Sequence, residues 1–268
     1  MLLKHIEQDR PNSQVIKSRL ERIYADAITQ SRCIRKANFT QIENADLQRL
    51  FAMYDETFLA NACGKTLSGL GCPLSFRLSG KMTRAGGKTT RNERFDRSGR
   101  VVSRQFEITV STTLLFGTFR TEDRPILVAG LQCRDRLEAL MRVMEHEIIH
   151  LVEMLLWRES SCAAYRFREI AGRLFEHRES NHQLITPQER AFKDLGIRAG
   201  DQVSFRFEGR ELNGKVNRIT RRATVLVPSD RGELYNDGIR YKKFYVPLAH
   251  LQRCEPTQRA AGIIGNTR

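Results

Sequence analysis

Three residues near the middle of the chain could together activate a water molecule. His146 and His150 are four residues apart, and Glu147 follows the first histidine directly. On a helix, side chains at this spacing lie on one face, so the two imidazoles can hold one Zn2+. The neighbouring carboxylate can then take a proton from water at the metal. The pattern His-Glu-x-x-His on a helix is typical of zinc hydrolases, and it leaves the substrate open.

The sequence around these residues predicts a long and largely buried helix. Asp135 is suited to cap its N-terminus, and apolar residues recur at helical spacing to about Trp157. Residues 148–156 are apolar almost all round, which indicates a helix in the interior of its domain. The plainer alternative is a pair of structural histidines beside a surface glutamate. That alternative does not explain why the motif lies at the end of a buried helix.

A catalytic zinc usually has three protein ligands, so a third ligand must come from elsewhere in the chain. Cys162 is the first candidate, because it starts the next predicted helix after a tight reversal. His182 is the second, after a short extended return. His177 is the third, because the far end of that helix lies roughly 20 Å away at the rise of an α-helix. Glu153 is expected as an outer partner or a surface residue. A small buried apolar side chain is an equal alternative for Cys162.

Composition favours a polyanionic partner. The chain has 268 residues with 45 Lys and Arg against 31 Asp and Glu, a formal net charge of +14. Such a balance suits nucleic acid, although a well-solvated surface is the simpler explanation. The N-terminal residues show no signal peptide, no apolar run has membrane-spanning length, and the six cysteines form no Cys-x-x-Cys pair. We therefore expect a cytoplasmic protein with no membrane partner, and association with the nucleoid is compatible with that location.

The order of periodic segments predicts an α+β fold. A helix at 44–62 is followed by a strand at 74–82, a Gly86-Gly87 turn into a second strand, and a clear strand at 106–111. From residue 200 short strands and turns alternate, which indicates a small SH3-like β-barrel. The predicted divisions are a basic helical or loosely ordered arm at 1–40, a zinc-site domain at 41–195, the barrel at 196–255, and a disordered tail at 256–268.

Two segments carry most of the excess positive charge. Between residues 81 and 104 there are eight basic and two acidic residues, and the barrel has twelve basic and seven acidic ones. Tyrosines and a phenylalanine interleave with the charges of the barrel, a composition that suits the stacking of bases. Either segment could instead be a solvated surface. The candidate nucleic-acid contacts are Lys81, Arg84, Lys88, Arg91, Arg221, Arg222, Lys242 and Lys243.

Residues 40–190 resemble the SprT-like zinc metallopeptidases of the SprT and Spartan type. The resemblance rests on the helix at 47–59, the strand at 106–111, His146-Glu147-x-x-His150, Arg166-Phe167 and Asn181-His182-Gln183. It implies a zincin-like core in which the two histidines and a third ligand hold Zn2+ and Glu147 is the general base. It also implies a protein substrate bound to nucleic acid, with DNA favoured. The strand at 106–111 is the expected edge for a substrate peptide.

Two features depart from that family. A third histidine followed by glycine usually starts the helix after the motif, whereas this chain has Ser160-Ser161-Cys162-Ala163. The C-terminal Cys-x-x-Cys ribbon of many relatives is replaced by the basic barrel. Two other functions therefore stay open. One is a non-catalytic zinc-containing module that binds nucleic acid or a transcription complex, and the other is a hydrolase that acts on something other than protein.

Overall fold

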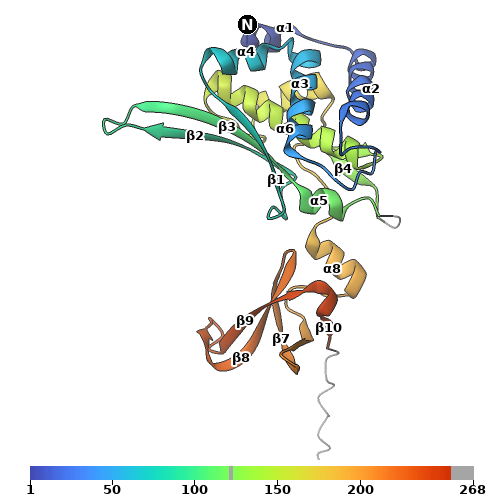
Figure 1. The fold of residues 1–268 in the computed structure, drawn as a ribbon, viewed down its shortest axis with the longest axis vertical. Helices are drawn as coiled ribbons and strands as arrows, with labels where there is room; N and C mark the ends of the chain where they lie inside the picture. Colours follow the sequence, from blue (N-terminus) through green and yellow to red (C-terminus); the bar gives the residue numbers. More distant parts are fainter. Residues whose placement is uncertain (121–122, 255–268) are drawn as a thin grey trace, which may run out of the picture. The chain divides into compact units, whose positions relative to one another are not determined.

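The computed structural model describes residues 1–120 and 123–254 and divides the chain into two compact units (Figure 1). Unit 1 is Met1–Thr186 and unit 2 is Pro187–Arg268. The fold is α+β, as the sequence predicted. The predicted disordered tail, 256–268, lies outside the described residues. Within those residues, every helix is too short or too polar to cross a bilayer.

The helices of unit 1 surround one long central helix, α6. This helix spans Arg136–Trp157 and is capped by Asp135, whose side chain accepts a hydrogen bond from the backbone of Glu138, as predicted from the sequence. The other helices of unit 1 are α1 (Leu2–Gln8), α2 (Ser13–Gln30), α3 (Asn44–Leu59), α4 (Ala62–Gly69), α5 (Thr112–Gly117) and α7 (Tyr165–Phe175).

A three-stranded sheet packs beside α6 in the strand order β1-β3-β2. Its strands are β1 (Leu74–Ser79), β2 (Gly87–Phe95) and β3 (Val101–Ser111). β3 pairs in parallel with β1 and antiparallel with β2. The predicted turn at Gly86-Gly87 does not join two paired strands, because β3 lies between β1 and β2. The tight hairpin is instead formed by β2 and β3. A small ribbon of β4 (Ile126–Val128) and β5 (Leu131–Cys133) precedes α6.

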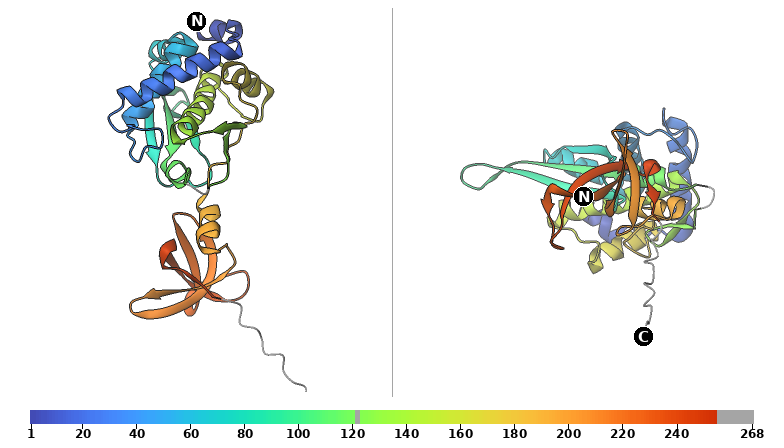
Figure 2. Two further views of the ribbon diagram at one scale, coloured as in Figure 1. Left: turned by 90° about the vertical axis from the view of Figure 1, so that its right-hand side faces the viewer. Right: turned by 90° about the horizontal axis from the view of Figure 1, so that it is seen from below.

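The outer half of the β2–β3 hairpin extends beyond the helices of unit 1 (Figures 1 and 2). Residues near its tip are exposed on both strands, from Arg94 to Ser103. The inner half packs on α6 and contains the buried residues Thr89, Phe106 and Ile108. One strand pair therefore belongs to the core at one end and to the solvent at the other.

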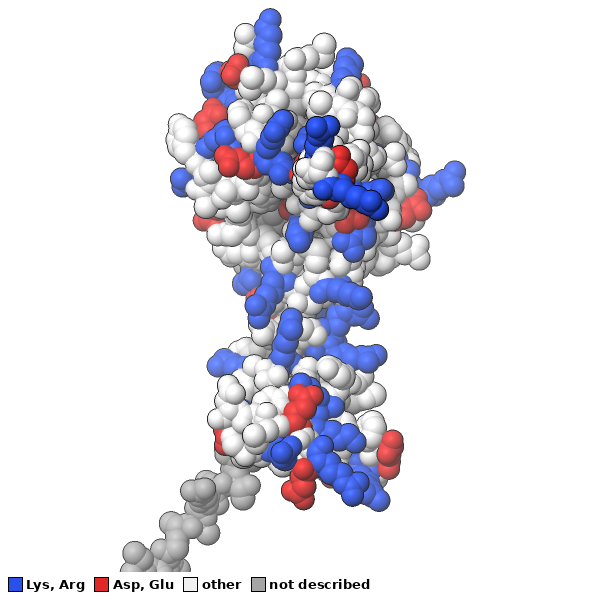
Figure 3. Space-filling view, turned by 90° about the vertical axis from the view of Figure 1, so that its left-hand side faces the viewer, with Lys and Arg blue, Asp and Glu red and all other residues white. Residues whose placement is uncertain are grey.

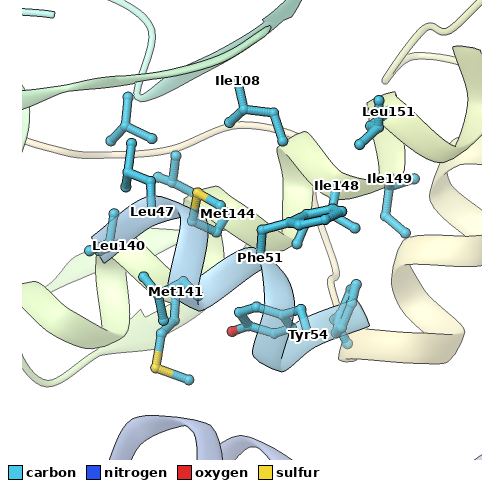
Figure 4. Close-up of a cluster of buried hydrophobic side chains, with 14 of the residues drawn as sticks. Leu47, Phe51, Tyr54, Ile108, Leu140, Met141, Met144, Ile148, Ile149 and Leu151 are labelled. Carbon is cyan, nitrogen blue, oxygen red and sulfur yellow. The ribbon is translucent and has the colours of Figure 1, made fainter. Parts of the chain in front are cut away.

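The core of unit 1 lies between α3, α6 and the sheet. Figure 4 shows Leu47, Phe51 and Tyr54 of α3 among side chains of α6, with Ile108 of β3 above them. On α6, Leu140, Met144, Ile148 and Leu151 are fully buried. Burial of such side chains stabilises each by about 1.5–3 kcal/mol. This packing fixes the position of α6 beside the sheet, and with it the position of the His-Glu-x-x-His motif.

The N-terminal residues belong to this core. Leu2 and Ile6 of α1 and Ile16, Leu20 and Ile23 of α2 are buried in the same cluster. His5 Nε2 also lies 2.7 Å from the carbonyl oxygen of Phe58 at the end of α3. Of the two alternatives for residues 1–40, the helical one agrees with α1 and α2. The loosely ordered one does not, because the apolar residues of this segment pack on the adjoining helices.

The described residues of unit 2, 187–254, form one α-helix and a five-stranded antiparallel sheet with its own hydrophobic core. The strand order is β10-β6-β7-β8-β9, so the last strand returns beside the first. The helix α8 belongs to this unit, which places the boundary before Pro187 rather than at residue 196. The elements are α8 (Pro187–Leu195), β6 (Gln202–Phe207), β7 (Arg210–Ile219), β8 (Arg222–Leu234), β9 (Arg240–Pro247), a 3-10 turn (Leu248–His250) and β10 (Gln252–Arg253).

Candidate metal and peptidase site

The two histidines of α6 face each other. His146 Nε2 and His150 Nε2 are 3.1 Å apart, and the two ring centroids are 4.8 Å apart. Two tetrahedral nitrogen ligands at about 2.0–2.1 Å from a zinc ion lie about 3.3 Å from each other. The spacing on the helix has therefore produced the separation that one shared ion requires.

Cys162 completes a group of three donors. α6 ends at Trp157, and its C-cap Arg158 adopts a left-handed conformation with φ 63° that reverses the chain before α7. This reversal returns Cys162, which is half-buried, to the histidines. The ligand atoms of His146, His150 and Cys162 all lie within 4.8 Å of one another. Among the three candidates for the third donor, the described structure groups only Cys162 with the two histidines.

A hydrogen-bonded chain fixes the orientation of His150. Its Nδ1 lies 2.6 Å from Ser160 Oγ, which in turn donates to Glu153 Oε2 at 2.5 Å. Arg166 Nε donates to the other oxygen of Glu153 at 2.8 Å. Since the one hydroxyl proton of Ser160 goes to the carboxylate, its oxygen accepts from Nδ1–H of His150. The lone pair of His150 is therefore on Nε2 and points at His146.

The donor set suits zinc. Burial lowers the pKa of His146 to about 3 and also lowers the pKa of His150, so both rings are neutral near pH 7. Phe167 of α7 packs on both rings, at 4.8 and 4.5 Å between centroids. Two neutral imidazoles and a cysteine, which binds as the thiolate, are ligands that Zn2+ prefers, and an outer carboxylate linked to a ligating histidine is a common feature of zinc sites.

Glu147 lies on the neighbouring face of α6, against the start of β2. The Thr89 hydroxyl is 2.8 Å from Glu147 Oε2 and 2.9 Å from the Glu147 carbonyl oxygen, and it donates to one of them at a time. Burial raises the pKa of Glu147 to about 7, against the opposing effect of the Thr89 hydrogen bond. A carboxylate with a pKa near the working pH is suited to general base catalysis.

Gly87 provides the space that Glu147 occupies. A Cβ atom at Gly87 would lie 2.5 Å from Glu147 Oε1, a contact that real side chains do not tolerate. At Gly86 the nearest atoms to such a Cβ are Val143 Cγ2 at 3.1 Å and His182 Cδ2 at 3.2 Å. The Gly-Gly pair thus allows the strand to approach the helix closely.

The edge of the sheet next to this site is β2. β3 lies in the centre of the sheet and is paired on both sides, so the expectation that the 106–111 strand is the free edge was wrong. β2 pairs only with β3 among the described strands, and its first residues contact Glu147. Its other edge is the place where an extended peptide could add as a strand.

A cavity of about 290 Å3 opens beside Glu147 and His146. Gly, Ala and Val make up half of its lining residues, and the polar groups come from Arg84, from α6 and from the segment before α8. Burial lowers the pKa of His182, which lies in this cavity and outside the group of three donors. The lining residues are Arg84, Ala85, Gly86, Gly87, Val128, Ala129, Val143, His146, Glu147, Ser180, Asn181 and His182.

His177 has a different partner. Its Nε2 lies 2.7 Å from Glu145 Oε2, and Tyr54 donates to Glu145 Oε1 at 2.7 Å. Arg142 also pairs with Glu145 at 3.1 Å. These groups are buried on another face of α6, so the expectation that His177 could complete the metal site was wrong. They anchor α3 and the end of α7 to the helix that carries the motif.

The predicted nucleic-acid contacts of unit 1 differ in exposure and in their partners. Lys81, Arg84 and Lys88 are exposed, whereas Arg91 donates to the carbonyl oxygen of Arg158 and pairs with Glu93 at 3.6 Å. Arg91 therefore joins β2 to the end of α6 and is not a free cation.

In unit 2 the predicted contacts are also divided. Arg221 and Arg222 are exposed at the start of β8. Lys242 and Lys243 are consecutive on β9 and so point to opposite faces. Lys243 pairs with Glu233 at 2.6 Å, while Lys242 lies over the ring of Phe244 at 5.4 Å. Seen unit by unit, blue Lys and Arg side chains still outnumber red acidic ones in Figure 3.

Several contacts of the site were not predicted from the sequence. Thr89 and Ser160 lie within hydrogen-bonding distance of motif residues, and Phe167, noted only as part of the family resemblance, packs on both histidines. The Gly86-Gly87 pair was visible as a turn, although its use is a close approach between strand and helix. Comparison with protein-family models, curated proteins and solved structures finds no match to this chain.

Proposed function

We propose that unit 1 is a zinc metallopeptidase of the SprT-like type with a zincin-like core. The observation that carries the proposal is the group formed by His146, His150 and Cys162, with the buried carboxylate of Glu147 next to it. The three donors would hold the ion, and the Ser160–Glu153–Arg166 chain would keep His150 aligned. Zinc bound there would supply a polarised water and positive charge for the oxygen that develops charge during peptide hydrolysis.

The protein groups then have distinct tasks. Glu147 takes the proton from the attacking water and delivers it to the leaving amine. The free edge of β2 aligns the substrate backbone by main-chain hydrogen bonds. The cavity beside Glu147 accepts one substrate side chain, and its size and walls favour a compact apolar residue.

We infer that unit 2 is an SH3-like barrel that helps to bind nucleic acid. The meander β6–β9, followed by a 3-10 turn and a last strand that pairs with the first, supports this assignment. Tyr245 is 65% exposed on β9, and the surrounding charge is mainly positive. The proposed substrates are therefore proteins bound to nucleic acid, with DNA favoured.

The test is cleavage of casein and of a DNA-binding protein, with and without single-stranded DNA. Glu147→Gln keeps the size and hydrogen bonding of the side chain and removes the base, so we expect a loss of about 100-fold or more. Zinc content, measured in parallel, should be equal in both proteins. Cleavage by Glu147→Gln at the wild-type rate would contradict the mechanism. Zinc in both proteins with cleavage by neither would favour the non-catalytic alternative.

A further inference from the structure

The tip of the β2–β3 hairpin combines exposed apolar side chains with arginines. The three apolar residues at the ends of the two strands are strongly exposed, in contrast to those of the inner half. They are Phe95 (59% exposed), Val101 (43%) and Val102 (56%). The arginines around them are Arg94, Arg97 and Arg100. Apolar groups at this exposure have a cost in water, which a binding partner would remove.

The positive charge of the tip is not neutralised within the hairpin. The carboxylate of Asp96 accepts hydrogen bonds from the backbone N–H groups of Ser98 and Arg100 within the turn. Glu93 forms an ion pair with Arg104 at 2.6 Å. Among the residues that the structure describes, the three tip arginines form no ion pair. The tip therefore presents three free guanidinium groups beside an exposed aromatic ring.

The ring lies at the outer end of the strand whose inner end contacts the candidate site. Alternation along β2 places Thr89, Arg91 and Glu93 on one face, and Thr89 of this face contacts Glu147. The register shifts after Arg94, and Phe95 pairs with Val101 of β3. Phe95 is six residue steps along the extended strand from Thr89, a distance of about 20 Å at the rise of an antiparallel strand. The strand thus links the buried carboxylate to the exposed ring.

We propose that the tip of the hairpin binds single-stranded nucleic acid. The ring of Phe95 stacks on an unpaired base, its cross-strand partner Val101 covers the adjoining sugar, and the three tip arginines contact phosphates. Only unpaired bases expose the flat surface that the ring requires. Arg91, which the sequence marked as a phosphate contact, is instead a structural residue at the base of this arm.

The arrangement of polar and apolar groups favours nucleic acid over a lipid surface. The apex of the hairpin is the polar turn Asp96–Arg100, and the apolar residues lie behind it on the strands. Insertion into a bilayer would place the Asp96 carboxylate and its turn deepest in the membrane, at high cost. Phosphate contacts at the apex with stacking behind it place each group in a suitable environment.

If unit 1 has the proposed peptidase function, the length of the hairpin also determines the distance between bound nucleic acid and the catalytic site. A strand of nucleic acid held at the tip lies about 20 Å from Glu147, so protein bound within that distance along it can enter the site. This part of the inference rests on the proposed function. The binding itself does not, because no tip residue contacts the three donors or Glu147.

The experiment is binding of the full-length chain to a short labelled single-stranded DNA, followed by fluorescence anisotropy over a series of salt concentrations. The variant Arg94→Gln/Arg97→Gln/Arg100→Gln should weaken binding at least about tenfold. The slope of log K against log salt should fall by about two, because each single-strand phosphate contact contributes roughly 0.7. Phe95→Ser should weaken binding about fivefold or more with an unchanged slope.

A matched control removes the same charge elsewhere on unit 1. Lys4, Lys17 and Lys36 are exposed and far from the hairpin in sequence, so Lys4→Gln/Lys17→Gln/Lys36→Gln should stay within about twofold of wild type. Equal losses from the two triple variants would overturn the proposal, since net charge alone would then explain binding. Wild-type affinity in the tip triple variant would also overturn it.

Two further probes separate the alternatives. Duplex DNA bound more tightly than the single strand, with Phe95→Ser neutral, would overturn the stacking assignment. Loss of binding to anionic phospholipid vesicles in Phe95→Ser, without loss of DNA binding, would assign the tip to membranes and overturn the proposal. Glu147→Gln should bind DNA as wild type does. A protein that binds DNA through the tip and cleaves nothing would thus disprove the peptidase and leave the tip assignment intact.

Discussion

The two ends of strand β2 have opposite properties. At its start, Gly87 and Thr89 lie against Glu147 in a buried, hydrogen-bonded environment where a single Cβ atom would not fit. At its end, Arg94 and Phe95 are exposed, and Arg94 forms no ion pair with any described residue. The same strand therefore forms a closely packed wall of the candidate site at its start and an exposed surface at its end, which we propose binds nucleic acid.

Different physical effects therefore determine how each end of β2 responds to substitution. In the site, polar groups are removed from water and depend on fixed partners, so a small change of shape has a large effect. At the tip, each group interacts with solvent or with a mobile partner, and the contributions of separate side chains should add. Substitutions at the two ends should therefore separate metal binding and cleavage from nucleic-acid binding.

The largest effect is expected at Cys162. Cys162→Ala removes one of three donors, so zinc affinity should fall by more than the about 10- to 100-fold that loss of an outer partner causes. Competition with a fluorescent chelator measures this affinity. Cys254→Ala, which changes a half-buried thiol in unit 2, is the control and should retain wild-type affinity. Equal zinc binding by Cys162→Ala and wild type would exclude Cys162 from the metal site.

Gly87→Ala should reduce cleavage by about 10- to 100-fold while zinc stays bound. The added Cβ would meet Glu147 Oε1 at 2.5 Å, so the carboxylate must move away from the position it now holds. Steady-state cleavage of a short peptide gives the effect on kcat. Gly69→Ala is the control, because its Cβ meets nothing within 4 Å. If both variants cleave at the wild-type rate, close packing at the start of β2 does not position Glu147.

Ser160→Ala should weaken zinc binding by about tenfold or somewhat more, within the range for loss of an outer partner. The change breaks the link between His150 Nδ1 and Glu153, so the ring of His150 can rotate. Ser161→Ala alters the neighbouring exposed serine and should have no effect. Zinc titration of both variants decides whether the link acts on the metal, and unchanged affinity in Ser160→Ala would show that it does not.

The smallest effect is expected at the tip. The triple variant of Arg94, Arg97 and Arg100 should keep its zinc and cleave a short free peptide within about twofold of wild type, because none of these residues contacts the site. The same peptide assay as for Gly87→Ala measures this. A loss as large as that in Gly87→Ala would mean that the two ends of β2 are not independent.

Local patterns predicted α6 well. The cap at Asp135, the apolar period and the end near Trp157 all agree with α6, because a helix depends on neighbours in sequence. The grouping of Cys162 with the two histidines also agrees, since a tight reversal limits where the next residues can lie. His146, His150 and Glu147 could be identified as candidate site residues from their spacing on a helix alone.

Pairings between distant segments could not be read in the same way. The insertion of β3 between β1 and β2 depends on contacts across the chain, and the alternation of each strand is compatible with several orders. His177 was placed correctly at the far end of α7, but its partner Glu145 was hidden in an otherwise apolar helix. Arg91 looked like part of a basic run, and only its contact with Arg158 shows that it is structural.

X-ray absorption at the zinc edge of the purified, zinc-loaded protein tests the proposed metal centre most directly. We expect about one zinc per chain with one sulfur ligand near 2.3 Å and nitrogen or oxygen ligands near 2.0–2.1 Å. The sulfur contribution should disappear in Cys162→Ala and persist in Cys254→Ala. A zinc site without sulfur in the wild-type protein, or no bound zinc at all, would contradict the assignment of His146, His150 and Cys162 as the metal centre.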